Sequence, residues 1–199
     1  MTANFLSLKN EVYRKLIHCA SSLIPIIYIY TKKEFFLLIL LFSLAINLII
    51  NYYQNKNIKI PFLSNLFNLV LRPYEHTRLW GSTYMLLGFT LISIIFPKDF
   101  AIAGMIITSI SDSLAAIIGM KYGKIKIIHN KTLEGFLAFI ISCYIILFIT
   151  INSMSFTILY ITSLFSGIIE LVTPTKYDNI TIPVCVSLTL YLFNLLWVF

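Results

Sequence analysis

Long apolar stretches alternate with short polar stretches along almost the whole chain. Seven apolar segments can be marked, at 16–30, 35–50, 81–96, 100–118, 136–151, 156–172 and 182–199. A helix of about 20 apolar residues crosses a bilayer, so each segment, extended slightly into its flanks, predicts a transmembrane helix. The pattern therefore predicts an all-α fold: a polytopic integral membrane helical bundle of about seven transmembrane helices, forming a single domain over residues 1–199.

The positively charged residues are distributed unevenly between the two sets of loops. With a cytoplasmic N-terminus, the outer turns hold Lys32, Lys33 and Lys98, and the other 12 of the 15 Lys and Arg residues face the cytoplasm. The positive-inside rule therefore predicts a cytoplasmic N-terminus, with cytoplasmic loops at about 51–80, 119–135 and 173–181. The acidic residues gather on the same side, which indicates a functional site facing the cytoplasm.

The composition excludes several classes of protein. Of the 199 residues, 59% are hydrophobic and 12% are charged, about half the charged fraction of a soluble domain. The net charge of +7 then indicates contact with anionic membrane lipids and not with nucleic acid. The three cysteines lie far apart inside apolar segments, so they predict neither a disulfide framework nor a zinc site.

Four polar residues precede or enter the first apolar segment. Glu11, Arg14, Lys15 and His18 are spaced i, i+3, i+4 and i+7, which places them on one face of a helix. Arg14 and Lys15 alone would fit a membrane anchor whose long side chains reach the interface. The acid and the imidazole on the same face favour a functional role.

Two acidic residues lie within apolar segments, where an exposed charge would be costly. Asp112, beside Ser113, lies in the segment 100–118, and Glu170 lies near the end of 156–172. Such residues normally face a bundle interior or an aqueous cavity. The alternative for Asp112 is a structural pairing with a buried base. Asp178 and Asn179 follow Glu170, and their oxygens are suited to Mg²⁺, although both residues are also common in turns.

The loop after the fourth apolar segment is rich in glycine and lysine. Gly119, Gly123 and Lys124 are followed by Lys131, with Glu134 and Gly135 after it. Glycines allow close approach of the backbone and lysines offer charge to phosphate. The spacing is not that of a Walker A loop, and a basic membrane-facing loop is the alternative. A second group lies around the start of the third segment and contains Arg72, Glu75, His76, Gly81 and Ser82. It could support the site, or it could simply form a loop at the membrane interface.

Taken in order, these motifs resemble those of the polyprenol kinase family, which includes dolichol kinase, phytol kinase and CTP-dependent diacylglycerol kinase. The residues that carry the resemblance are Glu11-x-x-Arg14-Lys15-x-x-His18, Gly81-Ser-Thr-Tyr84, Ser111-Asp112 through Gly119 and Gly123-Lys124, Lys131-Thr-Leu-Glu134-Gly135, and Glu170 with Asp178-Asn179. The motifs are short, but they extend over nearly the whole chain. The family is related in outline to the phosphatidate cytidylyltransferases.

The resemblance implies CTP-dependent phosphorylation of the hydroxyl group of a membrane lipid alcohol, such as a polyprenol, phytol or diacylglycerol. It also implies Mg²⁺ or another divalent cation. On this basis we assign metal binding to Asp112, Glu170, Asp178 and Asn179. Nucleotide or phosphate binding is assigned to Arg14, Lys15, Gly119, Gly123, Lys124 and Lys131, and catalysis to Asp112, His18, Lys131 and Glu134. His18 or a carboxylate would accept the proton of the alcohol. Supporting roles are assigned to Glu11, Arg72, Glu75, His76, Gly81, Ser82, Ser113 and Gly135.

Two other functions remain open from the residues. A cytidylyltransferase that makes a CDP-lipid would also use CTP, but the His-Gly-Gly and Asp-Arg elements of that family's C-terminal signature are missing from this sequence. A transporter could use the intramembrane acids Asp112 and Glu170. The charged residues, however, gather toward one side of the membrane and do not cross it, which favours the kinase.

Overall fold

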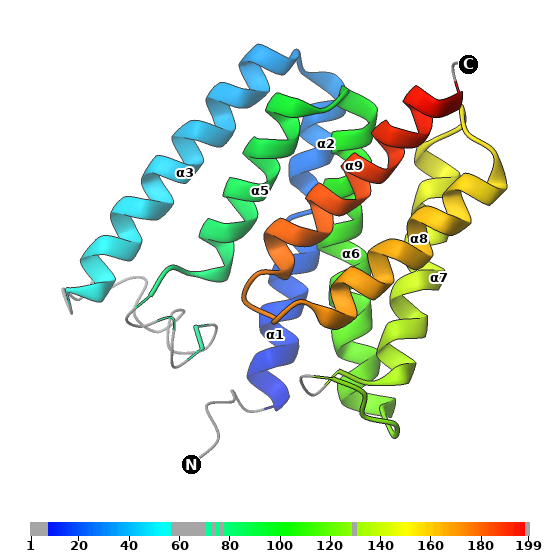
Figure 1. Ribbon diagram of the computed structural model, residues 1–199. Coiled ribbons are helices and arrows are strands. Elements are labelled where there is room, and N and C mark those ends of the chain that lie inside the picture. The colour runs from blue at the N-terminus through cyan, green and yellow to red at the C-terminus, as the bar shows by residue number, and fades with distance from the viewer. Residues whose placement is uncertain (1–7, 57–70, 73–74, 76–77, 129–130, 198–199) are drawn as a thin grey trace.

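The computed structural model describes residues 8–56, 71–72, 75, 78–128 and 131–197, and this part of the chain is helical (Figure 1). The helices are α1 (Leu8–Ala20), α2 (Leu23–Tyr30), α3 (Lys33–Asn55), α5 (Gly81–Ile95), α6 (Lys98–Tyr122), α7 (Leu133–Thr150), α8 (Phe156–Val172) and α9 (Asp178–Trp197). Within these residues there is no strand, only an isolated antiparallel bridge between Lys126 and Thr132. The predicted all-α fold is confirmed.

The lengths and surfaces of the helices are those of a membrane bundle. α3, α6, α7 and α9 are long and apolar enough to cross a membrane, and α5 and α8 are shorter apolar helices. Large apolar side chains lie on the outside, for example Phe42, Ile149 and Leu196, which are 69%, 67% and 73% exposed. An apolar exterior of this extent suits contact with lipid chains. The chain is therefore an integral membrane protein.

α6 forms the centre of the bundle. It is the most buried of the four long helices, and it contacts α1, α2, α5, α7 and α9. In Figure 1, α3 lies at one side of the bundle beside α5. The start of α1, the α6–α7 connection and the α8–α9 connection lie toward the end of the bundle opposite the α2–α3, α5–α6 and α7–α8 connections. Charged residues of three distant parts of the sequence are thus brought to one end.

The first apolar segment is not the single helix that was predicted over 16–30. It is divided between α1, which begins earlier, at Leu8, and α2, with the break at Ser21 and Ser22. Pro25 explains the break, because proline has no N–H to donate and its ring collides with the carbonyl group of the residue four positions before it, Ser21. The early start of α1 makes the whole stretch from Glu11 to His18 helical.

Two glycines allow the helices around the candidate site to approach closely. A Cβ atom at Gly88 of α5 would lie 2.6 Å from the main-chain oxygen of Asn179 in α9. A Cβ atom at Gly135 of α7 would lie 2.8 Å from the main-chain oxygen of Ala115 in α6. Real Cβ atoms do not occupy such positions, so any larger residue would push these helices apart.

Candidate active site

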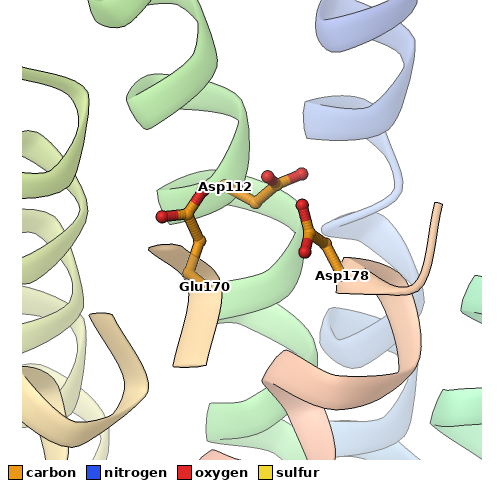
Figure 2. Close-up of side chains that lie close together, drawn as sticks. All are labelled: Asp112, Glu170 and Asp178. Atoms are coloured by element: carbon orange, nitrogen blue, oxygen red, sulfur yellow. The ribbon is translucent and has the colours of Figure 1, made fainter. Parts of the chain in front are cut away.

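Three carboxylates from three helices meet in the interior of the bundle (Figure 2). Asp112 of α6, Glu170 of α8 and Asp178 of α9 each place one oxygen within 4.8 Å of the others. These residues are only 4%, 6% and 3% exposed. Three buried negative charges so close together are unfavourable unless cations neutralise them.

Two lysines supply that neutralisation. Lys15 of α1 donates from Nζ to Asp112 Oδ2 at 2.5 Å. Lys131, in the α6–α7 connection, lies 2.8 Å from Glu170 Oε1 and 3.0 Å from Asp178 Oδ2. Burial opposes the charged form of Lys131, but the carboxylates of Asp178 and Glu170 outweigh it and raise the pKa of this lysine above its ordinary value. The three carboxylates and these two ammonium groups leave one negative charge.

The cluster retains unused hydrogen-bonding capacity. Asp178 Oδ1 is buried and accepts no hydrogen bond from the described residues, although Oδ2 of the same group is paired with Lys131. The hydroxyl of Ser111, next to Asp112, is also buried and has no hydrogen-bond partner among the described residues. Carboxylate oxygens are the ligands that Mg²⁺ prefers in proteins. A buried carboxylate with a free oxygen beside two others is a donor set that a divalent cation fits.

A chain of hydrogen bonds joins the start of α9 to α1 and to the segment before α5. His18 donates from Nε2 to Asn179 Oδ1 at 2.8 Å, and Asn179 Nδ2 donates to the main-chain oxygen of Gly81 at 2.8 Å. The Gly81 N–H donates to Glu75 at 2.7 Å, and Glu75 also accepts from the N–H of Arg72 at 2.8 Å. The amide group of Asn179 is therefore engaged, which leaves the three carboxylates as the candidate metal ligands.

The imidazole of His18 is enclosed. Its Nδ1 lies 3.4 Å from the main-chain oxygen of Ser109 and 3.3 Å from the hydroxyl of Ser113, which itself donates to Ser109. His18 is 8% exposed. Both ring nitrogens thus have polar neighbours, as expected for a residue that holds helices together.

Glu11 connects two arginines at the same end of the bundle. It accepts from Arg14 at 2.5 Å and from Arg72 at 2.7 Å, and Arg72 also lies 3.4 Å from the hydroxyl of Thr175. Burial alone would raise the pKa of Glu11, but the two guanidinium groups hold it at about 2. The guanidinium of Arg14, predicted to bind phosphate, is turned toward Glu11.

A second group of predicted residues lies around the α6–α7 connection. Glu134 accepts from the main-chain N–H of Lys124 at 2.9 Å, and both residues line a surface pocket together with Lys121, Tyr122 and Gly123. Gly119, Gly123 and Gly135 surround Thr132, whose hydroxyl oxygen accepts from the Gly135 N–H at 3.2 Å and caps α7. Glu134, predicted to be catalytic, is thus not one of the three clustered carboxylates.

Some neighbouring contacts were not predicted. Asn47 of α3 donates to Ser82 at 3.0 Å and accepts from Thr83 at 2.5 Å, tying α3 to the start of α5. The signal for this contact was present, since Asn47 is a polar residue within the apolar segment 35–50, and such a residue normally faces the interior of a bundle. His76, a predicted supporting residue, lies outside the described residues.

Known proteins resemble this chain over different extents. It is 31% identical over 198 residues to an uncharacterized protein of Rickettsia prowazekii, covering 91% of this chain and 94% of the other. It is 30% identical over 95 residues to CTP-dependent diacylglycerol kinase 1 of Schizosaccharomyces pombe, covering 43% of this chain and 44% of that kinase. It is 30% identical over 192 residues to dolichol kinase of Saccharomyces cerevisiae, covering 89% of this chain and 36% of that kinase. No family model and no solved structure matches the chain.

Proposed function

Because this chain belongs to the family of the Rickettsia protein and has lipid kinases as distant homologues, we propose that it transfers a phosphoryl group from CTP to the hydroxyl group of a membrane lipid alcohol. The observation that carries this proposal is the buried cluster of Asp112, Glu170 and Asp178 with Lys15 and Lys131. Phosphoryl transfer needs an arrangement that positions a polyphosphate and neutralises its charge. Carboxylates that bind a divalent cation, beside lysines that bind phosphate, supply these elements.

We assign divalent-cation binding, with Mg²⁺ as the expected ion, to Asp112, Glu170 and Asp178. The unpartnered Oδ1 atom of Asp178 supports the assignment. When bound, the ion would neutralise charge on the polyphosphate. Lys131 and Lys124 are assigned to phosphate binding. Lys124 is exposed, which leaves its ammonium group accessible to a nucleotide arriving from water.

We assign a carboxylate of the cluster as the base that accepts the proton of the lipid hydroxyl. The hydroxyl oxygen forms the new bond to the γ-phosphorus, the bond from that phosphorus to the β–γ bridging oxygen breaks, and CDP leaves. The carboxylate takes the hydroxyl proton and later returns it to solvent. His18 suits this role less well, because its Nε2 is hydrogen-bonded to Asn179 and its ring is buried. We assign His18 to the positioning of Asn179.

The proposed reaction also accounts for the location of the site. The site lies in a membrane bundle, at the end that holds the α6–α7 and α8–α9 connections. The distribution of Lys and Arg supports a cytoplasmic location for this end, where CTP and Mg²⁺ are available. The lipid alcohol would reach the site from the bilayer, with its hydroxyl at the level of the headgroups.

A product assay tests the proposal. Protein in nanodiscs is incubated with Mg²⁺, with CTP labelled at either the γ or the α phosphate, and with diacylglycerol, phytol, undecaprenol and phosphatidic acid. We expect γ-label in a lipid phosphate and release of CDP. Asp178→Asn should abolish the transfer. The matched control Asp99→Asn, an exposed residue at the opposite end of α6, should retain it.

Other distributions of the label would overturn the proposal. Transfer of the α-label into lipid would identify a cytidylyltransferase. If folded protein transferred neither label, the kinase proposal would fail, and ion flux through the protein reconstituted into vesicles would become the next measurement. Transfer from ATP at least as fast as from CTP would overturn the choice of nucleotide and leave the kinase assignment standing.

A further inference from the structure

Lys131 holds two of the three clustered carboxylates together. Its Nζ lies 2.8 Å from Glu170 Oε1 and 3.0 Å from Asp178 Oδ2, and it also donates to the main-chain oxygen of Glu170. The ammonium group therefore already binds two of the carboxylates that the proposed function assigns to a divalent cation. In the ligand-free protein it acts as their counter-ion.

The two lysines of the cluster are attached to the fold in different ways. Lys15 lies within α1, and its side chain is 7% exposed. Lys131 lies in the connection between α6 and α7, one residue before Thr132, and its side chain is 11% exposed. The main chain of Lys131 is hydrogen-bonded to Ile127 and Ile128 of the same connection, so the ammonium group would leave by rotation of its flexible side chain, without movement of any helix. Lys131 is therefore the lysine that can leave the cluster.

A divalent cation and the ammonium group of Lys131 would compete for Glu170 and Asp178. Both would lie within hydrogen-bond or coordination distance of the same carboxylates, and two positive charges so close together in a buried site repel strongly. The polyphosphate of a nucleotide removes the conflict, because its oxygens offer the displaced ammonium group another negative partner.

Resting on the proposed function, we propose that Lys131 is an exchangeable ligand: a divalent cation at Asp112, Glu170 and Asp178 displaces its ammonium group, which then binds the phosphoryl oxygens of the nucleotide. Without nucleotide the cation must displace a bound lysine and binds weakly. Without cation the lysine stays on the carboxylates and the nucleotide binds weakly. Cation and nucleotide therefore strengthen each other's binding by the same factor, so that the charged site is completed only when both are present.

Amine labelling of the unmodified protein tests the displacement directly. Detergent-solubilised protein is treated with an amine-acetylating reagent in increasing Mg²⁺, and acetylation of each lysine is quantified by mass spectrometry. We expect acetylation of Lys131 to rise several-fold with Mg²⁺. Lys126, an exposed lysine of the same connection, serves as the internal reference and should not change.

Cation affinity provides a second and independent measurement. Binding of Mn²⁺, without nucleotide, is followed by electron paramagnetic resonance for the wild type, Lys131→Met and the matched control Lys126→Met. Removal of the competing ammonium group should tighten Mn²⁺ binding on the order of tenfold. The control should bind Mn²⁺ as the wild type does.

The possible results separate this inference from the proposed function. The exchange is refuted if Mn²⁺ binds, but Mg²⁺ does not change the acetylation of Lys131 and Lys131→Met binds Mn²⁺ no more tightly than the wild type. In that case γ-label transfer by the wild type would still support the kinase assignment. If no cation binds at concentrations that support transfer even when a non-hydrolysable CTP analogue is present, both the exchange and the metal assignment are refuted. If the cation releases Lys131 but no phosphoryl group is transferred, the exchange stands and the kinase assignment fails.

Discussion

The buried ion pair between Lys15 and Asp112 allows a structural role to be separated from a catalytic one. Its two charged atoms are 2.5 Å apart, and both side chains are almost completely buried. We consider three variants of nearly unchanged shape: Lys15→Met, Asp112→Asn and the combination of both. The reasoning depends on the charge that each variant leaves among the three carboxylates and two lysines of the cluster.

The charge of the cluster predicts an unequal effect of the two single substitutions. Lys15→Met leaves three carboxylates with one ammonium group, a net charge of −2, and removing one partner of a buried pair costs about 3–5 kcal/mol. Asp112→Asn leaves two carboxylates with two ammonium groups, and its amide oxygen can still accept from Lys15. Its cost should be about 1–3 kcal/mol. The double variant returns to the wild-type net charge of −1, so its stability should lie within about 1–2 kcal/mol of the wild type.

Unfolding and activity are measured on the same preparations. The free energy of unfolding is obtained from titration of mixed micelles with a denaturing detergent, followed by circular dichroism. The two single losses sum to about 4–8 kcal/mol, so a double variant within about 1–2 kcal/mol of the wild type implies an interaction energy of at least about 2 kcal/mol. Transfer of γ-label from CTP should be lost in every variant that lacks the Asp112 carboxylate, including the stable double variant.

Two results would refute this reasoning. Additive losses of stability would mean that the two charges are not coupled in the folded protein. Normal phosphoryl transfer by the double variant would remove Asp112 from the proposed reaction, because its carboxylate would then be needed for neither stability nor chemistry.

Three further predictions follow from contacts near the site. The pKa of Glu11 is lowered from 4.5 to about 2, so its ionisation stabilises the fold fully above pH 4.5, and this contribution is lost as the pH falls toward 2. Glu11→Gln should therefore lower the free energy of unfolding by about 3 kcal/mol at pH 7. At pH 3 the loss, measured by thermal unfolding, should be roughly half of that. Gly88→Ala should cost about 1–3 kcal/mol by overpacking α5 against the backbone of α9, measured as a lower melting temperature. Gly167→Ala meets only side-chain atoms, of Ile140 and Phe136, and should cost less. Glu134→Gln should lower kcat less than about tenfold, whereas Asp178→Asn should lower it at least about a hundredfold. The reason is that Asp178 is one of the three clustered carboxylates and Glu134 is not.

Most helix positions could be predicted because an apolar segment in a membrane protein has few alternative structures. The segment 156–172 coincides with α8, and 81–96 differs from α5 by one residue. The prediction was wrong for the first segment, where hydropathy is continuous but Pro25 interrupts the backbone hydrogen bonds. Hydropathy measures the cost of contact with lipid and carries no information about a missing N–H group.

The candidate site could be predicted only in part. The spacing of Glu11, Arg14, Lys15 and His18 identified a polar helix face, and the burial of Asp112 was expected from its place in an apolar segment. The sequence could not show that Lys15 pairs with Asp112, 97 residues away. It also could not rank Glu134 against Glu170, since both are acids on the same side of the membrane. Only the packing of α8 against α9 places Glu170 beside Asp178.

The origin of the clustered groups explains why a charged site is tolerated in a membrane bundle. The carboxylates come from α6, α8 and α9, and the lysines come from α1 and the α6–α7 connection, so no single helix carries both charges of a pair. A helix that turned its carboxylate toward lipid would bear an uncompensated charge. Assembly of the bundle brings each carboxylate next to an ammonium group and lowers that cost. The same charges that prepare the site for a cation and a polyphosphate therefore also favour the arrangement of helices that creates it.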